Sequence, residues 1–428
     1  MPKVSDSECP ICRYSQIRTT APFDITKCAV SLLKAPSLDN EDALYSMRYK
    51  HETPRVYLYD VTSSYLEGQE NELGEYGYDR DGKKGKKQIV IGLLTDQDGF
   101  PLSVKVFKGN TSDQTTVWDQ IRKLKDRFGA KKITLVGDRG MLKTPQQEAL
   151  NQEEFHFITA ITKAQIKKLL KRGIFQLELF DTVLCEIEVD DVRYILRRNP
   201  QRRGEVRTNR ENMIQKAKRL SIDRNEYLHE HPKADPEVAL RKVKSYLSKR
   251  KPAMFCSVSH TGRILSFELD EEAKKEYEEL DGCYVIKTDL KREEACAKEI
   301  HDRYKDLALV EQAFRRMKTV HLEQRPVFVR KASRTRGHMV VVMLSYMINH
   351  HIKSYWKEMD CTIKEGIEEL STINANVITI GTKEIAMVPK PRKKAAQLLK
   401  ALLVTLPQSL LHLGVKVATK RKLLERRK

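Results

Sequence analysis

Residues 56–62 have the sequence Val-Tyr-Leu-Tyr-Asp-Val-Thr, and the interpretation of the chain starts from this stretch. β-Branched and aromatic residues dominate it and no glycine or proline interrupts it, so it predicts a β-strand. Asp60 lies in its middle, although aspartate is depleted from strands. A carboxylate in a central strand is costly to bury unless a cation or hydrogen-bond donors compensate it. The stretch therefore predicts either a functional carboxylate or an aspartate that caps the turn beginning at Thr62.

A second aspartate ends another short apolar strand. Residues 132–141 have the sequence Lys-Ile-Thr-Leu-Val-Gly-Asp-Arg-Gly-Met, so Asp138 follows the strand and precedes a glycine-containing turn. Carboxylates at strand ends of an open sheet project into the crevice where ligands bind. Asp138 alone is more simply explained as a loop cap. Two strands that each present an aspartate to one sheet edge predict a site of hard oxygen ligands for Mg²⁺ or Mn²⁺.

A third carboxylate lies in a segment with helical periodicity, residues 304–318. Its apolar face is formed by Leu309, Val310, Ala313, Met317 and, just beyond, Val320. Its other face is formed by Tyr304, Leu307, Glu311, Arg315 and Lys318. An aromatic hydroxyl, a carboxylate and two cations therefore recur every three or four residues on one helix face. A solvated charged face is the simpler explanation of such a pattern.

With their flanking residues, the three carboxylates resemble those of the DDE transposases of bacterial and archaeal insertion sequences, most closely the group named for insertion sequence four. That group's signature around the third carboxylate is Tyr, two residues, Arg, three residues, Glu, six residues, Lys. Tyr304, Glu311 and Lys318 match it in identity and spacing, whereas Leu307 stands at its arginine position. The family arginine contacts DNA phosphate near the cut, and Arg315, one helical turn beyond Glu311, is a candidate substitute.

Further matches follow the family's order along the chain. Residues 77–94 are similar to its second strand and residues 98–102 to its hairpin turn. Residues 109–113 are similar to its Gly-Asn-x-x-Asp motif, and residues 281–288 to the segment that leads to the third carboxylate. The resemblance extends from about Pro54 to His351. It implies a mixed α/β fold, with a ribonuclease-H-like catalytic core and a mostly β insertion domain between the second Asp and the Glu.

This resemblance implies five parts. They are a short N-terminal region (1–53), the first part of the catalytic core (54–162), an inserted β-rich basic domain (163–288), the rest of the core (289–360) and a C-terminal region with a basic tail (361–428). The first part is shorter than the family's end-recognising region. It is interpreted either as a truncated DNA-binding part or as a sign that end recognition lies elsewhere.

Composition points to nucleic acid. The 428 residues include 79 Lys and Arg against 59 Asp and Glu, a formal charge of +20. A surplus this large favours a polyanionic partner over charge that serves solubility alone. An anionic membrane surface is the other candidate, but no lipidation motif or amphipathic anchor supports it, and the longest apolar run, residues 339–348, is too short to span a bilayer.

The cysteines and the N-terminus indicate a reducing compartment. Most of the eight cysteines are isolated and no signal peptide precedes them, so we expect free thiols in a cytoplasmic, nucleoid-associated protein. Cys9 and Cys12 form a lone CxxC pair. Zinc would need a second ligand pair at suitable spacing, so the sequence does not favour a zinc site at this pair.

The implied function is DNA transposition: metal-dependent cleavage and strand transfer at the ends of an insertion sequence. The resemblance implies two Mg²⁺ or Mn²⁺ ions, with Asp60 bridging both, Asp138 holding one and Glu311 the other. It also implies double-stranded DNA as partner, both transposon ends and target, bound by a homodimer. The residues expected to contact DNA are Tyr304, Lys318, Arg315, Arg139, Arg202 and Arg203.

Two alternatives remain at the level of sequence. A truncated or decayed transposase copy would act only as a DNA-binding protein or a non-specific nuclease, and Leu307 favours this. A basic RNA- or ribosome-associated structural protein would explain the charge, but not why the three acids lie where they do. Arg202 and Arg203 belong to an arginine cluster suited to phosphate contacts, although a solvated charge run explains each arginine equally well.

Overall fold

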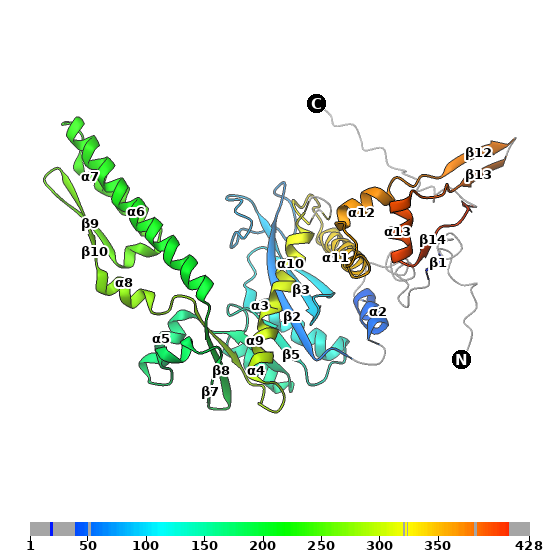
Figure 1. Ribbon diagram of the computed structural model, residues 1–428, viewed down its shortest axis with the longest axis horizontal. Helices are drawn as coiled ribbons and strands as arrows, with labels where there is room; N and C mark the ends of the chain where they lie inside the picture. The colour runs from blue at the N-terminus through cyan, green and yellow to red at the C-terminus, as the bar shows by residue number, and fades with distance from the viewer. Residues whose placement is uncertain are drawn as a thin grey trace.

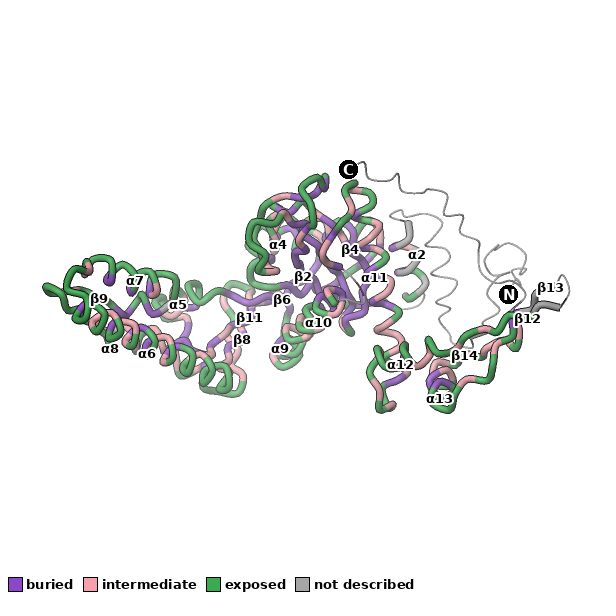
Figure 2. The backbone as a smooth tube through the Cα atoms, turned by 90° about the horizontal axis from the view of Figure 1, so that it is seen from above, coloured by how far each residue is buried: buried purple, intermediate pink, exposed green. Residues whose placement is uncertain are grey.

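The structure is a computed structural model that describes residues 18–19, 39–49, 53–319, 322, 324–380 and 383–410. The Cys9–Cys12 pair and the basic tail at residues 420–428 lie outside the described residues. Three parts are visible in the views of Figure 1 and Figure 2: a long arm, a central body and a smaller C-terminal part. Buried residues concentrate in the central body (Figure 2), where the candidate site also lies.

The central body is built on one eight-stranded mixed sheet with strand order β4-β3-β2-β5-β6-β11-β8-β7. β2 pairs antiparallel with β3 and parallel with β5, and β5 pairs parallel with β6. The strands are β2 (Val56–Tyr65), β3 (Gln88–Asp96), β4 (Pro101–Lys108), β5 (Thr134–Gly137), β6 (His156–Ala160), β7 (Cys185–Val189), β8 (Val192–Arg198) and β11 (Cys283–Thr288). The predicted mixed α/β class is confirmed.

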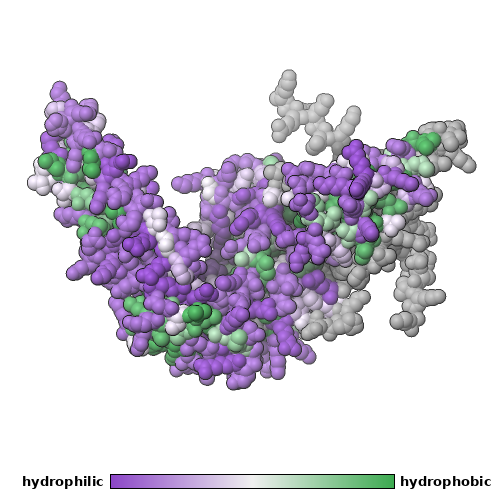
Figure 3. Space-filling model, viewed as in Figure 1, coloured by the Kyte–Doolittle hydropathy of each residue, from purple (hydrophilic) through white to green (hydrophobic). Residues whose placement is uncertain are grey.

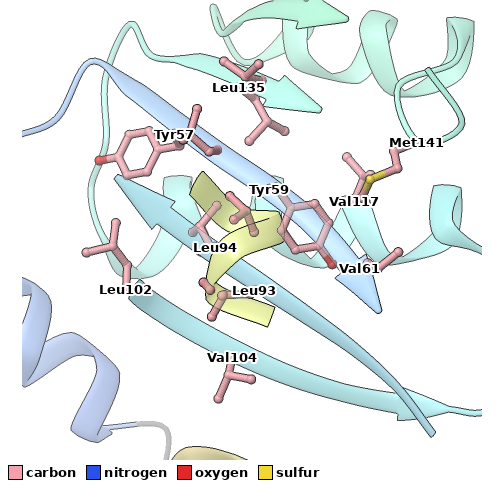
Figure 4. Close-up of a cluster of buried hydrophobic side chains, with 14 of the residues drawn as sticks. Tyr57, Tyr59, Val61, Leu93, Leu94, Leu102, Val104, Val117, Leu135 and Met141 are labelled. Carbon is pink, nitrogen blue, oxygen red and sulfur yellow. The ribbon is translucent and has the colours of Figure 1, made fainter. Parts of the chain in front are cut away.

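The two central strands of the first half are buried on both faces. All nine residues of β3 are buried, as expected for a continuous run of Ile, Val and Leu. Gly92 in β3 gives room to a tyrosine of the neighbouring strand, because a Cβ atom there would lie 2.2 Å from the Tyr59 hydroxyl oxygen. Figure 4 shows Tyr57 and Tyr59 among the apolar side chains of β2, β3 and β4. This packing makes β2 a rigid support for Asp60.

Helices cover the sheet and carry the remaining site residues. α10 buries Val310, Ala313, Phe314 and Met317 and packs against β2, and α11 packs against β4. The helices of the central body and its N-terminal flank are α2 (Asp39–Arg48), α3 (Asp113–Arg122), α4 (Thr144–Gln152), α5 (Lys163–Lys171), α9 (Ala297–Lys305), α10 (Leu307–Met317) and α11 (Ala332–Tyr355), with a π-helical turn at Lys123–Arg127. The single helix expected over residues 304–318 is therefore interrupted, at Asp306.

The arm is a helical projection with its own hydrophobic core. Its elements are α6 (Pro200–Glu230), α7 (Pro236–Ser248), β9 (Cys256–Thr261), β10 (Ile264–Leu269) and α8 (Glu271–Glu278). Ile214 of α6, Val243 of α7, Val258 of β9 and Leu265 of β10 belong to one buried cluster, separate from the main core. Figure 1 shows α6 and α7 as the long rod of this arm.

The expectation of a mostly β insertion is wrong, because helices outweigh strands in it. Asn199 caps α6, since its side chain accepts a hydrogen bond from the Arg202 backbone at 3.0 Å, and Pro200 occupies the first turn. A long run without an internal proline then continues as helix for 31 residues. The strands β7 and β8 of the insertion join the main sheet beside β11.

The C-terminal part combines short helices with a small sheet. Its elements are α12 (Ile363–Leu370), β12 (Asn376–Ile380), β13 (Lys383–Met387), α13 (Lys393–Ala401), β14 (Val404–Thr405), which pairs with β1 (Arg18–Thr19), and β15 (Ser409–Leu410). Among the described residues, none of the helices has the length and apolarity needed to cross a bilayer.

Candidate active site

Strand pairing brings the first two carboxylates together. β2 and β5 run parallel with Tyr59 opposite Gly137, so Asp60 and Asp138 follow at the same level of adjacent strands. Asp60 lies inside β2, which continues to Tyr65, and its Oδ1 accepts a hydrogen bond from the Val61 backbone at 2.8 Å. The alternative that Asp60 caps a turn is therefore wrong. Asp138 is exposed just past β5, and its Oδ1 accepts from the Arg139 backbone at 2.8 Å.

The third carboxylate reaches the same place from α10. Because the buried side of α10 packs on β2, its exposed Glu311 faces away from the core. Asp60, Asp138 and Glu311 line one pocket of about 380 Å³. The remaining lining residues are Asn199, Tyr284, Tyr304, Lys305, Leu307 and Ala308. Residues far apart in the sequence thus form one concave acidic site.

The pKa of Asp60 reflects its burial first and the neighbouring carboxylates second. Burial raises the pKa of Asp60 to about 7, opposed by the hydrogen bond from the Val61 amide. The charges of Asp138 and Glu311 raise it further, and the Arg80 guanidinium lowers it. Arg80 itself forms an ion pair with Asp113 at the start of α3. A positive charge placed among the three carboxylates would stabilise their ionised forms.

Two predicted DNA contacts lie beside Asp138. The Tyr304 hydroxyl of α9 donates a long hydrogen bond of 3.5 Å to Asp138 Oδ1 and lines the pocket. Burial, followed by the charge of Asp138, holds the pKa of Tyr304 well above its usual range, so the hydroxyl stays a donor. Arg139 is exposed at the next position, and its charge acts on Tyr304 in the opposite direction.

Lys318 lies elsewhere. Its Nζ donates to Asp81 Oδ1 at 2.8 Å, with side chains only 13% and 2% exposed respectively, and it is not among the pocket-lining residues. Arg325 binds the same Asp81 oxygen. Burial lowers the pKa of Lys318, and Asp81 opposes that shift.

The other predicted cations occupy two surfaces. Arg315 is exposed on α10, one turn beyond Glu311. Arg202 and Arg203 are exposed in the first turn of α6, and Arg202 forms an ion pair with Glu205 at 2.8 Å. They stand at the root of the arm, directly after the pocket-lining Asn199.

Several pocket residues escape prediction from the sequence. Tyr284 of β11 lies against His301 of α9, with the Tyr284 hydroxyl 2.7 Å and the Arg197 guanidinium 3.0 Å from His301 Nε2. Burial lowers the pKa of His301, consistent with the neutral ring that can accept from Arg197. Asn199 carries no local motif, and Tyr284 lies in the family-like segment 281–288 without being marked there as a site residue. The pairing of β8 with β11 brings the two to the site.

The residues of the pocket suit a divalent ion by their chemistry. Three carboxylates supply the hard oxygen atoms that Mg²⁺ and Mn²⁺ prefer, and the pKa of Asp60 is raised first by its burial and only then by the charges of Asp138 and Glu311. As placed in the described part of the chain, no group of three or more His, Cys, Asp or Glu side chains could hold a metal ion. Asp60, Asp138 and Glu311 thus share a pocket and have suitable donor atoms, but they do not form a ligand set in this structure.

Comparison with known proteins adds a family. A family model described as "Transposase DDE domain" matches residues 51–348. No curated protein matches this sequence. Among solved structures, a piggyBac transposase synaptic complex with hairpin DNA is similar at 8% identity over 89% of this chain and 59% of that chain, with a TM-score of 0.38. The Mos1 transposase paired-end complex with the left transposon end is similar at 10% identity over 33% and 59%, with a TM-score of 0.18. TM-scores this low do not establish a shared fold.

Proposed function

The chain belongs to the family of transposase DDE domains, and on that premise we propose that it is a DNA transposase that cleaves and joins strands at the ends of an insertion sequence. The observation that carries the proposal is the pocket formed by Asp60, Asp138 and Glu311. These residues come from two adjacent parallel strands and a helix packed on one of them. A solvated charged face does not explain why Glu311 lies in the same pocket as the two aspartates.

The three carboxylates Asp60, Asp138 and Glu311 would together hold two Mg²⁺ or Mn²⁺ ions. Such ions activate an attacking water or 3′-hydroxyl and stabilise the leaving oxygen of a phosphodiester. The chain's own contribution is placement: β2 and β5 fix the two aspartates, and α10 presents Glu311 to them. The Tyr304 hydroxyl, kept protonated, donates a hydrogen bond at the edge of this site.

The positions of the cations support a path for double-stranded DNA. Arg139 and Arg315 flank the carboxylates, and Arg202 and Arg203 stand at the root of the arm. We propose that these four residues, with Tyr304, contact DNA phosphates. Figure 3 shows an open notch between the arm and the central body, lined mainly by hydrophilic residues. Lys318 is not included, because Asp81 occupies its ammonium group.

Finer features of the proposal rest on the sequence. The spacing of Tyr304, Glu311 and Lys318 supports the group named for insertion sequence four, and with it a bacterial or archaeal origin. The order β4-β3-β2-β5-β6, with its first three strands antiparallel and the last two parallel, supports a ribonuclease-H-like core. A homodimer on DNA and a nucleoid-associated location in the cytoplasm complete the proposal.

The proposed function is tested by strand cleavage of the DNA that flanks the gene. With Mn²⁺ or Mg²⁺, the native chain should nick at the ends of the element, and Glu311→Gln should not. Glu148→Gln, on α4 outside the pocket, is the matched control and should cleave normally. Absence of nicks with every metal would reject the transposase activity.

A decayed copy or a non-specific nuclease is the second candidate, favoured by one observation. Leu307 lines the pocket where the family signature has an arginine. Metal-dependent nicks without preference for the element's ends would establish a nuclease. Specific end binding without nicks would establish a decayed copy, and binding to RNA in preference to DNA would favour the structural protein instead.

A further inference from the structure

A buried aspartate outside the pocket joins the segments that carry the candidate active site. Asp81 lies in the connection between β2 and β3, and its side chain is 2% exposed. Its Oδ1 accepts hydrogen bonds from Lys318 Nζ at 2.8 Å and from Arg325, and its Oδ2 accepts one from the Tyr65 backbone at 3.3 Å. The Asp81 carboxylate thus binds two cationic side chains and the backbone amide at the end of β2.

The segments it joins are those that hold Asp60 and Glu311. Tyr65 is the last residue of β2, whose middle residue is Asp60, and Lys318 directly follows α10, about two turns beyond Glu311.

The connection after α10 is fastened to the same strand end. Gln324 Nε2 donates to Ser64 Oγ at 3.0 Å, and the Val327 amide donates to the Tyr65 carbonyl at 3.1 Å. Arg325, which binds Asp81, lies between these two contacts.

The environment of Lys318 suits an internal tie better than a DNA contact. A phosphate-binding lysine needs an accessible ammonium group, whereas this side chain is 13% exposed and already ion-paired. We propose that Asp81 is a positioning residue: by binding Lys318 and Arg325 it fixes α10, and with it Glu311, against β2. The inference rests on the proposed role of Glu311.

The two possible roles of Lys318 predict different double-mutant cycles. If Asp81 and Lys318 act together as a tie, Asp81→Asn leaves the buried Lys318 ammonium group without its carboxylate, and Lys318→Met leaves Asp81 bound to Arg325 alone. Either change releases α10, so removing both adds little further loss. If Lys318 instead binds phosphate, Lys318→Met weakens DNA binding, and Asp81→Asn frees the lysine and leaves binding unchanged or tighter.

The experiment compares the full chain with Asp81→Asn, Lys318→Met and the double variant, using DNA that contains the element's end. For a tie, end affinity measured in chelator stays unchanged in all three. The Mn²⁺ concentration for half-maximal cleavage rises about 10- to 100-fold, as for residues that orient metal ligands. The rise in this Mn²⁺ concentration is no larger in the double variant than in either single variant. Hydrogen exchange of the α10 amides becomes faster, whether or not the chain cleaves DNA.

Glu41→Gln is the matched control for loss of a buried ion pair. Glu41 binds Lys123 at 2.7 Å with side chains 8% and 6% exposed, and it lines no part of the pocket. A shift in Mn²⁺ requirement equal to that of Glu41→Gln, or weaker end binding in Lys318→Met alone, overturns the proposal. If the native chain does not cleave, the proposed function fails, and unchanged exchange of α10 in Asp81→Asn would overturn the tie separately.

Discussion

At the scale of single residues, Asp60 is a carboxylate whose ionisation opposes folding when no cation is bound. Its pKa is raised to about 7, mainly by burial and then by Asp138 and Glu311. Between about pH 4, where an unfolded aspartate ionises, and about pH 7, the folded chain keeps a proton that the unfolded chain has lost. The free energy of unfolding contributed by this group therefore falls as pH rises through that window, and is constant above it.

The first prediction concerns Asp60→Asn, which replaces the ionisable carboxyl group by a neutral amide. With chelator present, the native chain should lose stability between about pH 5 and about pH 7, whereas the variant lacks the titrating group. The melting temperature of the variant should therefore rise relative to that of the native chain by several degrees over this range and then stay constant. Thermal melts across this range measure it. Added Mn²⁺ should raise the melting temperature of the native chain at about pH 8, and not that of the variant. An exposed aspartate, as in Asp360→Asn, serves as control; a difference that does not change with pH would contradict the assignment.

Leu307 gives the second prediction. It lines the pocket one turn before Glu311, so an arginine there would place a guanidinium beside the DNA phosphates. Leu307→Arg should bind the element's end about tenfold tighter, as expected of a charged hydrogen bond. Binding in chelator measures it, with Leu307→Met as an uncharged control. If affinity does not change, another cation already fills this position, and Arg315→Ala should then weaken binding.

The residue scale also shows where prediction from the sequence ends. Asp60 and Asp138 could be proposed from their places inside and just after predicted strands, and Glu311 from the resemblance of its spacing to Tyr304 and Lys318. The partner of Lys318 could not, because Asp81 lies far away in a turn-rich loop and meets it only through tertiary packing. Asn199 and Tyr284 reach the pocket by strand pairing, which has no local signal.

At the scale of elements, α7 stands out by its unbalanced charge. Its outer side carries Arg241, Lys242 and Lys244, followed by Lys249 and Arg250, all exposed. Among the described residues these five have no carboxylate within ion-pair distance, whereas many exposed lysines elsewhere do. Clustered positive side chains repel one another, and DNA phosphates that bind beside them remove this repulsion. We therefore expect α7 to lie along duplex DNA.

Neutralising Lys242, Lys244 and Lys249 to glutamine tests this third prediction. The slope of log affinity against log salt should become shallower by up to about 3, since each lost phosphate contact removes about 0.9. Fluorescence anisotropy at several salt concentrations measures it. The matched control neutralises Lys86, Lys125 and Lys167, which are exposed but ion-paired. Equal slopes in the two triple variants would remove α7 from the DNA surface.

Element types were predictable where the pattern was continuous, and not where packing decides. The run of β-branched and aromatic residues from Val56 to Thr62 predicts where β2 begins, but the strand continues to Tyr65 because Ser63, Ser64 and Tyr65 also pair with β3. The periodicity over residues 304–318 correctly predicts helix, but not the interruption at Asp306 between α9 and α10. Apolar residues keep a helical spacing across the break, so their spacing gives no sign of it. The resemblance implied a mostly β insertion, whereas the 31-residue α6 dominates it.

At the scale of the whole molecule, the arm is joined to the central body by neighbouring chain ends and by an ion pair between Lys167 of α5 and Glu276 of α8. The Asn199 amide donates to the Gly282 carbonyl at 2.9 Å, so the chain leaves and re-enters the central body at neighbouring positions. The arm also buries its own core, separate from that of the sheet. A unit with its own core and adjacent ends can be removed without breaking the fold that carries it.

Joining Asn199 directly to Gly282 deletes the arm and gives the fourth prediction. The central body should keep its cooperative melt and its Mn²⁺-dependent stabilisation, because all three carboxylates and both flanking strands remain. DNA binding should weaken and lose much of its salt dependence, because Arg202, Arg203 and the α7 cations are gone. Calorimetry and anisotropy on the deleted chain measure the two effects. If the deletion abolished the melt, the arm would be part of the catalytic fold; if it left the salt dependence intact, the DNA would lie on the central body alone.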